Sequence, residues 1–151
     1  MLEELEPGGV LVIDAKGIEV FDYSFANELF GKTVLSMAGE FQGRFVVVEH
    51  LTTYTHENLA KAMESLGLTI AERKKGKIEL LGKVHPADSE TFSVLVGAKE
   101  PVSAVELSKR LNVNLTAMNE RLSKLMSMGL ARRTKTASSA GREQYEYSAF
   151  R

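Results

Sequence analysis

The sequence has 151 residues, enough for one medium domain or two small ones, and its 44% hydrophobic and 26% charged residues are typical of globular proteins. It contains no cysteine, which excludes disulfides and cysteine-ligated metal sites, and no apolar run approaches the ~20 residues of a membrane helix. The acidic N-terminus, MLEELEPGG, does not fit a signal peptide, so we expect a cytoplasmic protein with no membrane partner.

The charge is uneven along the chain. Residues 1–83 contain 9 Lys/Arg and 13 Asp/Glu, a net charge of −4, whereas residues 84–151 contain 10 Lys/Arg and 7 Asp/Glu, a net charge of +3. Together with a change from strand-rich to helix-rich sequence at 82–85, this predicts two domains, 1–83 and 84–151. Only the second is expected to meet a polyanion.

Strand and helix patterns alternate in the first part. Apolar runs predict strands at 10–13, 44–49, 68–72 and 78–81, with a basic hairpin turn at 73–77. Helical spacing predicts helices from Asp22 to Gly39 and from His56 to Leu66. The alternation predicts a small α/β domain with a mixed sheet.

This part also resembles a known family. The segment Val12-Ile13-Asp14-x-x-Gly17-Ile18-Glu19-Val20-Phe21-Asp22-x-Ser24-Phe25-Ala26-x-Glu28-Leu29-Phe30-Gly31, with Val47-Val48-Glu49, Asn58-Leu59 and Leu80-Leu81-Gly82, looks like the prokaryotic STAS-like domain of unknown function. The wider STAS family includes anti-sigma-factor antagonists, in which a serine that opens a helix is phosphorylated. The resemblance places Ser24 on that serine, although Tyr23 and Phe25 replace the neighbouring serine and glycine, and it implies a kinase or ATPase partner. From the residues alone, Ser24 either caps the helix or accepts phosphate.

The second part shows a helix-turn-helix pattern. Pro86 is expected to start a helix, and Ser103 with Glu106 matches a capping box that starts the next. After an interruption at Asn112 to Asn114, apolar residues return at helical spacing until Gly129. Strands are expected at 130–136 and 144–150, joined by a flexible hairpin at 137–142.

The spacing Leu111-x-Val113…Met118…Leu122-x-x-Leu125-x-x-x-Gly129-Leu130-x-Arg132 resembles the winged helix-turn-helix of bacterial and archaeal transcription regulators. Met118 and Ala131 depart from the usual valine and isoleucine but keep these positions apolar. The resemblance implies double-stranded DNA as partner and binding as a homodimer.

Helical spacing also predicts which side chains meet DNA. Met118, Leu122 and Leu125 must face the core, which leaves polar positions of the recognition helix for bases and phosphates. Basic residues on or beside the wing are expected to contact the backbone or minor groove. The predicted DNA-binding residues are Thr116, Asn119, Glu120, Arg121, Lys124, Arg132, Arg133, Lys135 and Arg142.

No catalytic motif is present. Glu49, His50, His56 and Glu57 are the only grouping that suggests acid–base or metal chemistry, and their spacing matches no zinc motif. We therefore expect no enzyme activity, no metal site and no cofactor.

The sequence thus predicts an α/β domain (a small STAS-like mixed sheet with helices) followed by a C-terminal winged helix-turn-helix. The function expected is DNA-binding transcription regulation, with the first domain mediating dimerisation, partner binding or sensing. The alternative is a partner-switching adaptor controlled at Ser24, with the winged helix used for protein contacts.

Overall fold

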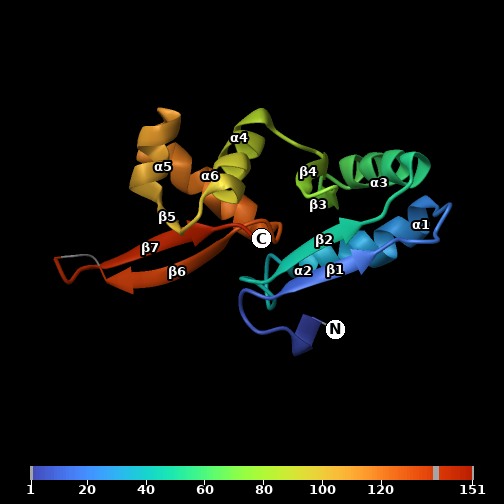
Figure 1. The fold of residues 1–151 in the computed structure, drawn as a ribbon, viewed down its shortest axis with the longest axis horizontal. Helices are drawn as coiled ribbons and strands as arrows, with labels where there is room; N and C mark the ends of the chain where they lie inside the picture. The colour runs from blue at the N-terminus through green and yellow to red at the C-terminus, as the bar shows by residue number, and fades with distance from the viewer. Residues whose placement is uncertain (1, 138–139, 151) are drawn as a thin grey trace.

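The apolar segments of the first part form one four-stranded sheet in the computed structural model, which describes residues 2–137 and 140–150 (Figure 1). The first three strands are parallel and the fourth is antiparallel to the third, so the sheet is mixed, as predicted. In chain order, which is also their order in the sheet, the strands are β1 (Val10–Asp14), β2 (Phe45–Glu49), β3 (Thr69–Lys74) and β4 (Lys77–Gly82).

Helices cover one face of this sheet. A continuous helical run joins β1 to β2 and contains a π-helical turn, and a second helix joins β2 to β3. Their apolar side chains pack against Val46, Val48 and Ile70, which lie on this face. The sheet is preceded by the 3-10 turn η1 (Leu2–Glu4), and the helical elements are α1 (Tyr23–Ala26), η2 (Asn27–Gly31), α2 (Lys32–Ser36) and α3 (Thr53–Ser65).

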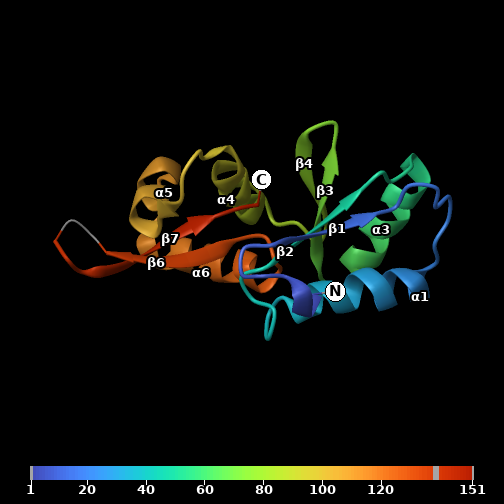
Figure 2. The same ribbon diagram turned by 60° about the horizontal axis from the view of Figure 1, so that its bottom comes forward.

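The second part is a winged helix. Its elements follow the order helix, strand, helix, helix, strand, strand, and its sheet has the order β5-β7-β6. The β6–β7 hairpin extends away from the helices as the wing (Figures 1 and 2). The elements are α4 (Pro86–Gly97), β5 (Val102–Ser103), α5 (Ala104–Leu111), α6 (Leu115–Ser127), β6 (Arg132–Ala137) and β7 (Glu143–Ser148).

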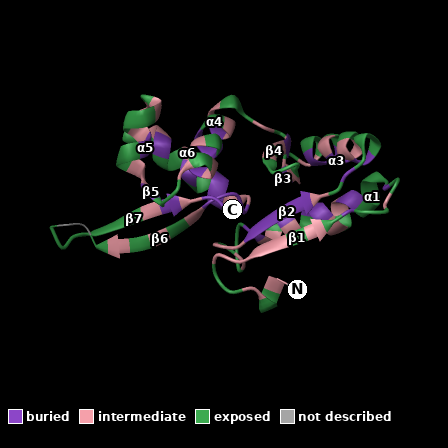
Figure 3. Cartoon of the chain, viewed as in Figure 1, coloured by how far each residue is buried: buried purple, intermediate pink, exposed green. Residues whose placement is uncertain are grey.

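The winged helix packs on the other face of the four-stranded sheet. The Phe150 ring lies 5.6 Å from that of Phe45 in β2 and 6.3 Å from that of Phe92 in α4, measured between centroids. Phe45 and Val47 belong to the same buried cluster as Met118 and the other core residues of the winged helix. Because side chains alternate along a strand, β2 serves two cores, and Figure 3 shows it buried along most of its length.

Some boundaries differ from those predicted. The helix expected from His56 begins at Thr53, because Thr52 and Thr55 form a reciprocal capping box ahead of it. The basic turn occupies only Lys75 and Gly76, since the strands on either side extend into the predicted loop. Strand β5 was not predicted. Within the described residues, no helix combines the length and apolar character needed to cross a membrane.

Candidate nucleic-acid interface

Local sequence signals determine where α5 and α6 begin and where α5 ends. The Ser103 hydroxyl accepts a hydrogen bond from the Glu106 backbone N–H and starts α5. Asn112 ends that helix in the left-handed conformation (φ 52°), which asparagine adopts more readily than most residues. The Asn114 side chain then accepts from the Ala117 N–H and starts α6. The Ser103 cap and the interruption at Asn112 to Asn114 are therefore confirmed, whereas the Asn114 cap was not predicted.

The N-terminal part of α6 presents a polar face to solvent. Thr116, Asn119 and Glu120 are exposed, whereas Met118, Leu122 and Leu125 on the opposite side are completely buried. Leu115, at the first turn, is 45% exposed although it is large and apolar. A side chain of this kind suits contact with a thymine methyl group. This face combines hydrogen-bonding and apolar groups, as base-edge recognition requires.

Arg121 and Lys124 lie on a different side of α6, against α4. The Arg121 guanidinium Nη1 donates to the Ala87 carbonyl at 3.4 Å and to Glu90 and Thr91 side-chain oxygens at 3.3 Å each. Lys124 Nζ lies 2.6 Å from Oδ2 of Asp88, which is only 6% exposed. Both cations therefore hold α6 to α4 in this structure, and a direct role for them at DNA stays a prediction.

The wing has one basic face. Arg133 and Lys135 are exposed and alternate with the partly buried Thr134. They share their face of the hairpin with Tyr147, because Arg133 pairs with Tyr147 in the strand register. Tyr147 packs into the core that contains Met118, so the basic face of the wing lies on the side of the helices.

Arg133 and Lys135 have partners within the wing. The Arg133 guanidinium lies 4.2 Å from the centre of the Tyr145 ring, and Lys135 Nζ lies 2.9 Å from Oε2 of Glu143. Both pairs are solvent-exposed, so they hold the side chains only weakly and leave them able to exchange partners.

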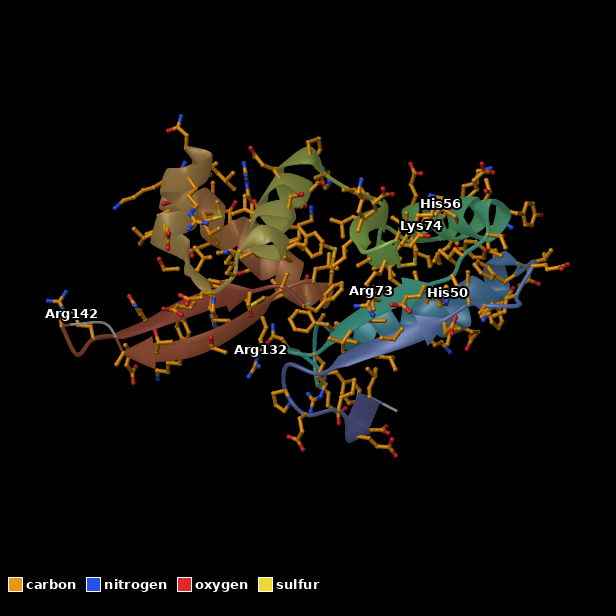
Figure 4. The ribbon with its side chains drawn as sticks, in the orientation of Figure 1. His50, His56, Arg73, Lys74, Arg132 and Arg142 are labelled. Atoms are coloured by element: carbon orange, nitrogen blue, oxygen red, sulfur yellow. The ribbon has the colours of Figure 1, made fainter. Side chains whose placement is uncertain are left out.

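The other two predicted wing residues are separated in space. Arg132 starts β6 and lies beside the N-terminal loop, where a Cβ added to Gly8 would stand 2.3 Å from Arg132 Nη1. Arg142 is exposed at the tip of the wing, far from Arg132 (Figure 4). The predicted residues Ser138 and Ser139 of the flexible hairpin lie outside the described residues.

Three further exposed polar residues of the two helices were not among the predicted contacts. Ser123 is exposed one turn beyond Asn119 and Glu120, and Lys109 and Arg110 are exposed in the last turn of α5. Helical spacing identifies Ser123 as surface. Only the crossing of α5 over α6 shows which surface residues share a side, and the sequence pattern does not contain that angle.

Ser24 is exposed, and its hydroxyl is not the helix cap. The Asp22 carboxylate accepts from the Phe25 N–H at 2.8 Å and fills that role. Large apolar side chains surround the serine, since Val20, Tyr23 and Phe25 are each at least 42% exposed. Of the two roles considered for Ser24, helix capping is therefore performed by Asp22 instead.

The histidines of the first part belong to two separate pairs. His50 Nδ1 donates to Asp14 at 2.7 Å, and His56 Nδ1 lies 2.6 Å from a Glu72 oxygen. The His50 bond, followed by the Lys16 backbone N–H, lowers the pKa of Asp14 below its usual value, so this carboxylate stays ionised. Over residues 2–137 and 140–150, no three His, Cys, Asp or Glu side chains gather as metal ligands would.

Comparisons with known proteins add little to this geometry. No protein-family model and no curated protein matches the sequence. Among solved structures, the chain is similar to one described as "Possible transcriptional regulator from Methanosarcina mazei Go1", with a TM-score of 0.41 and 15% sequence identity over 54% of this chain and 74% of that chain. A likeness at this level does not decide function, which has to be argued from the site itself.

Proposed function

We propose that the protein is a DNA-binding transcription regulator whose α6 reads base edges in the major groove while the wing contacts the backbone. The observation that supports this most directly is the polar face of α6, on which Thr116, Asn119 and Glu120 are exposed, together with the exposed Arg133 and Lys135 of the wing. The side-chain amide of asparagine can accept from adenine N6 through its oxygen and donate to N7 through its nitrogen, and arginine and lysine on the wing neutralise phosphates.

The proposal assigns different tasks to the two elements. Asn119 and Leu115 specify sequence, whereas Arg133 and Lys135 contribute affinity for any duplex. Glu120, which follows Asn119 on α6 and is exposed, would repel phosphate, so it fits only where it accepts from a cytosine amino group. Because the exposed face of α6 is nearly neutral, the proposal requires the wing and a second subunit to supply the remaining affinity for DNA.

The test is a mobility-shift assay with genomic fragments, repeated at two salt concentrations. We expect Asn119→Ala to remove about 1–3 kcal/mol of discrimination at one base pair. Asn58→Ala, the same change in α3, is the control. Arg133→Ala should instead weaken all sequences alike and lower the salt slope by about one. Binding without sequence preference that Asn119→Ala leaves unchanged would refute the reading function.

The first part is proposed to be a STAS-like domain that mediates dimerisation, partner binding or sensing. A homodimer is expected because winged-helix regulators usually bind paired half-sites. Light scattering of the protein bound to its DNA measures this state, and a stable monomer on an isolated site would contradict it.

The alternative function is partner switching through Ser24. It is favoured by the exposure of this serine beside Tyr23 and Phe25, which offer an apolar surface for a protein partner such as a kinase or ATPase. A phosphate there would add a charge of about −2 to the acidic first part. Mass spectrometry of protein from its native cells decides this, because persistent absence of phosphate across growth conditions excludes the switch.

A further inference from the structure

The β3–β4 hairpin carries more positive charge than its fold requires. Its turn consists of Lys75 (φ 50°) and Gly76 (φ 76°), the two left-handed residues of a tight hairpin, for which Asn-Gly or Asp-Gly is the usual choice. Lys74 and Lys77 stand directly opposite each other in the register. Like charges in that position destabilise a hairpin, so folding alone does not account for these lysines.

The charges of the hairpin are only partly neutralised. Arg73 is paired with Glu49, whereas Lys74, Lys75 and Lys77 make no ion pair with any residue in the described part of the chain. The hairpin stands clear of neighbouring elements in Figure 2, so solvent and solutes reach its tip. These three lysines form what we call the lysine tip.

The lysine tip borders a cleft of about 410 Å³ on the helix side of the sheet. Thr53, the first residue of α3, lies across this cleft, and His56 lies beside Lys74 (Figure 4). The cleft also contains two carboxylates. Glu72 is 2% exposed and is hydrogen-bonded to His56. Glu79 is therefore the exposed carboxylate of this cleft. Three unpaired ammonium groups are thus set against a single exposed carboxylate.

We propose that the lysine tip binds a ligand with several closely spaced phosphate groups. Lysine ammonium groups act as point charges toward phosphate and do not need the planar geometry that arginine imposes. Three of them around one turn can follow a phosphate chain, and the positive end of α3 adds to the attraction. The chemistry is shared by a small polyphosphate and by a nucleic-acid backbone. This proposal does not depend on DNA binding by α6.

The test uses the full chain with inorganic tripolyphosphate and, separately, a short duplex without a binding site, each titrated by calorimetry. The variant Lys74→Gln/Lys75→Gln/Lys77→Gln is compared with Lys61→Gln/Lys83→Gln/Lys99→Gln, which removes the same charge elsewhere. We expect the first variant to lose at least about tenfold in tripolyphosphate affinity, or about 1.4 kcal/mol, and the control to lose far less.

Each outcome has a definite meaning. Loss of tripolyphosphate binding with duplex binding unchanged identifies a small ligand, whereas a matching loss of duplex binding identifies a nucleic-acid backbone. Equal effects of the two triple variants on both ligands would overturn the proposal. The lysine-tip variant loses the Lys74–Lys77 repulsion, so its thermal midpoint of unfolding should not fall. If the midpoint does fall, the single variant Lys75→Gln replaces it in the binding measurements. Sequence preference at α6, measured with Asn119→Ala, remains a separate test.

Discussion

The Arg121 guanidinium donates to one backbone oxygen and two side-chain oxygens of α4. These contacts determine how the loss of Arg121 should change the stability of the protein. Its side chain is 20% exposed, and Thr91, one of its acceptors, is completely buried. Loss of the guanidinium leaves the Thr91 hydroxyl bonded only to the Ala87 carbonyl. The contacts are long, so the individual bonds are weak ones.

We therefore expect Arg121→Ala to lower the free energy of unfolding by about 1 kcal/mol without altering the sequence preference for DNA. Urea denaturation followed by circular dichroism measures the first quantity. For the denaturation measurement alone, Arg110→Ala is the control, because Arg110 makes only an exposed pair with Glu106 within α5, worth about 0.3–0.5 kcal/mol. A change of preferred base with unchanged stability would instead place Arg121 in the groove.

Sequence reasoning reaches some of these residues and not others. The burial of Met118, Leu122 and Leu125 follows from helical spacing and is confirmed. Arg121 lies next to those positions on the helix, so spacing leaves open whether it meets solvent or a neighbouring helix. The angle at which α4 crosses α6 decides whether Arg121 meets solvent or α4. That angle depends on the volumes of side chains contributed by α4, α5 and α6, which no single helix pattern contains.

At the scale of the elements, Gly129 brings the end of α6 against the first part of the chain. It ends α6 with φ +70°, and a Cβ placed on it would lie 2.7 Å from Met37 Cγ. Met37 follows α2 and is completely buried. The sequence predicted the glycine as a helix end, but not that this end touches another part of the protein.

Two costs should therefore add in Gly129→Ala. A left-handed alanine costs about 1–2 kcal/mol. The clash with Met37 adds about 1–3 kcal/mol of overpacking. Gly67→Ala isolates the first cost, because Gly67 ends α3 with φ +69° and has no neighbouring atom within 4 Å of the added Cβ. Equal losses of unfolding free energy in the two variants would show that the Met37 side chain moves aside for the added Cβ at no energetic cost.

Local signals predicted most of the elements because they act within a few residues. The apolar run Val10 to Ile13 and the caps Ser103 and Gly129 are examples, and each is confirmed. The π-helical turn Asn27–Gly31 was not predicted, since apolar spacing in that segment fits a regular helix equally well. Strand β5 has only two residues and exists through its pairing with β7, which no local pattern reveals.

At the scale of the whole molecule, the sequence predicts two domains, whereas packing joins their surfaces. Phe150 lies on Phe45 of β2, a contact between residues far apart in the chain. Such contacts cannot be inferred from local periodicity. Their consequence is that a ligand or partner acting on the four-stranded sheet has a packed route to α6 through β2 and the shared core.

The strength of that coupling can be measured with Phe150→Ala, which should lower the free energy of unfolding by about 3–5 kcal/mol. The Phe150 ring packs between the two parts, so we expect them to unfold together in the wild type. Calorimetry should then show a single transition in which the calorimetric and van't Hoff enthalpies agree. Phe25→Ala is the control, because this ring is 42% exposed and packs on Phe21 within the first part alone, so its loss should lower the free energy of unfolding by clearly less. If the wild type instead melts in two steps, with Phe150→Ala lowering only the one assigned to the winged helix, then 1–83 and 84–151 are independent domains. The contact between them would then be too weak to couple the four-stranded sheet to α6.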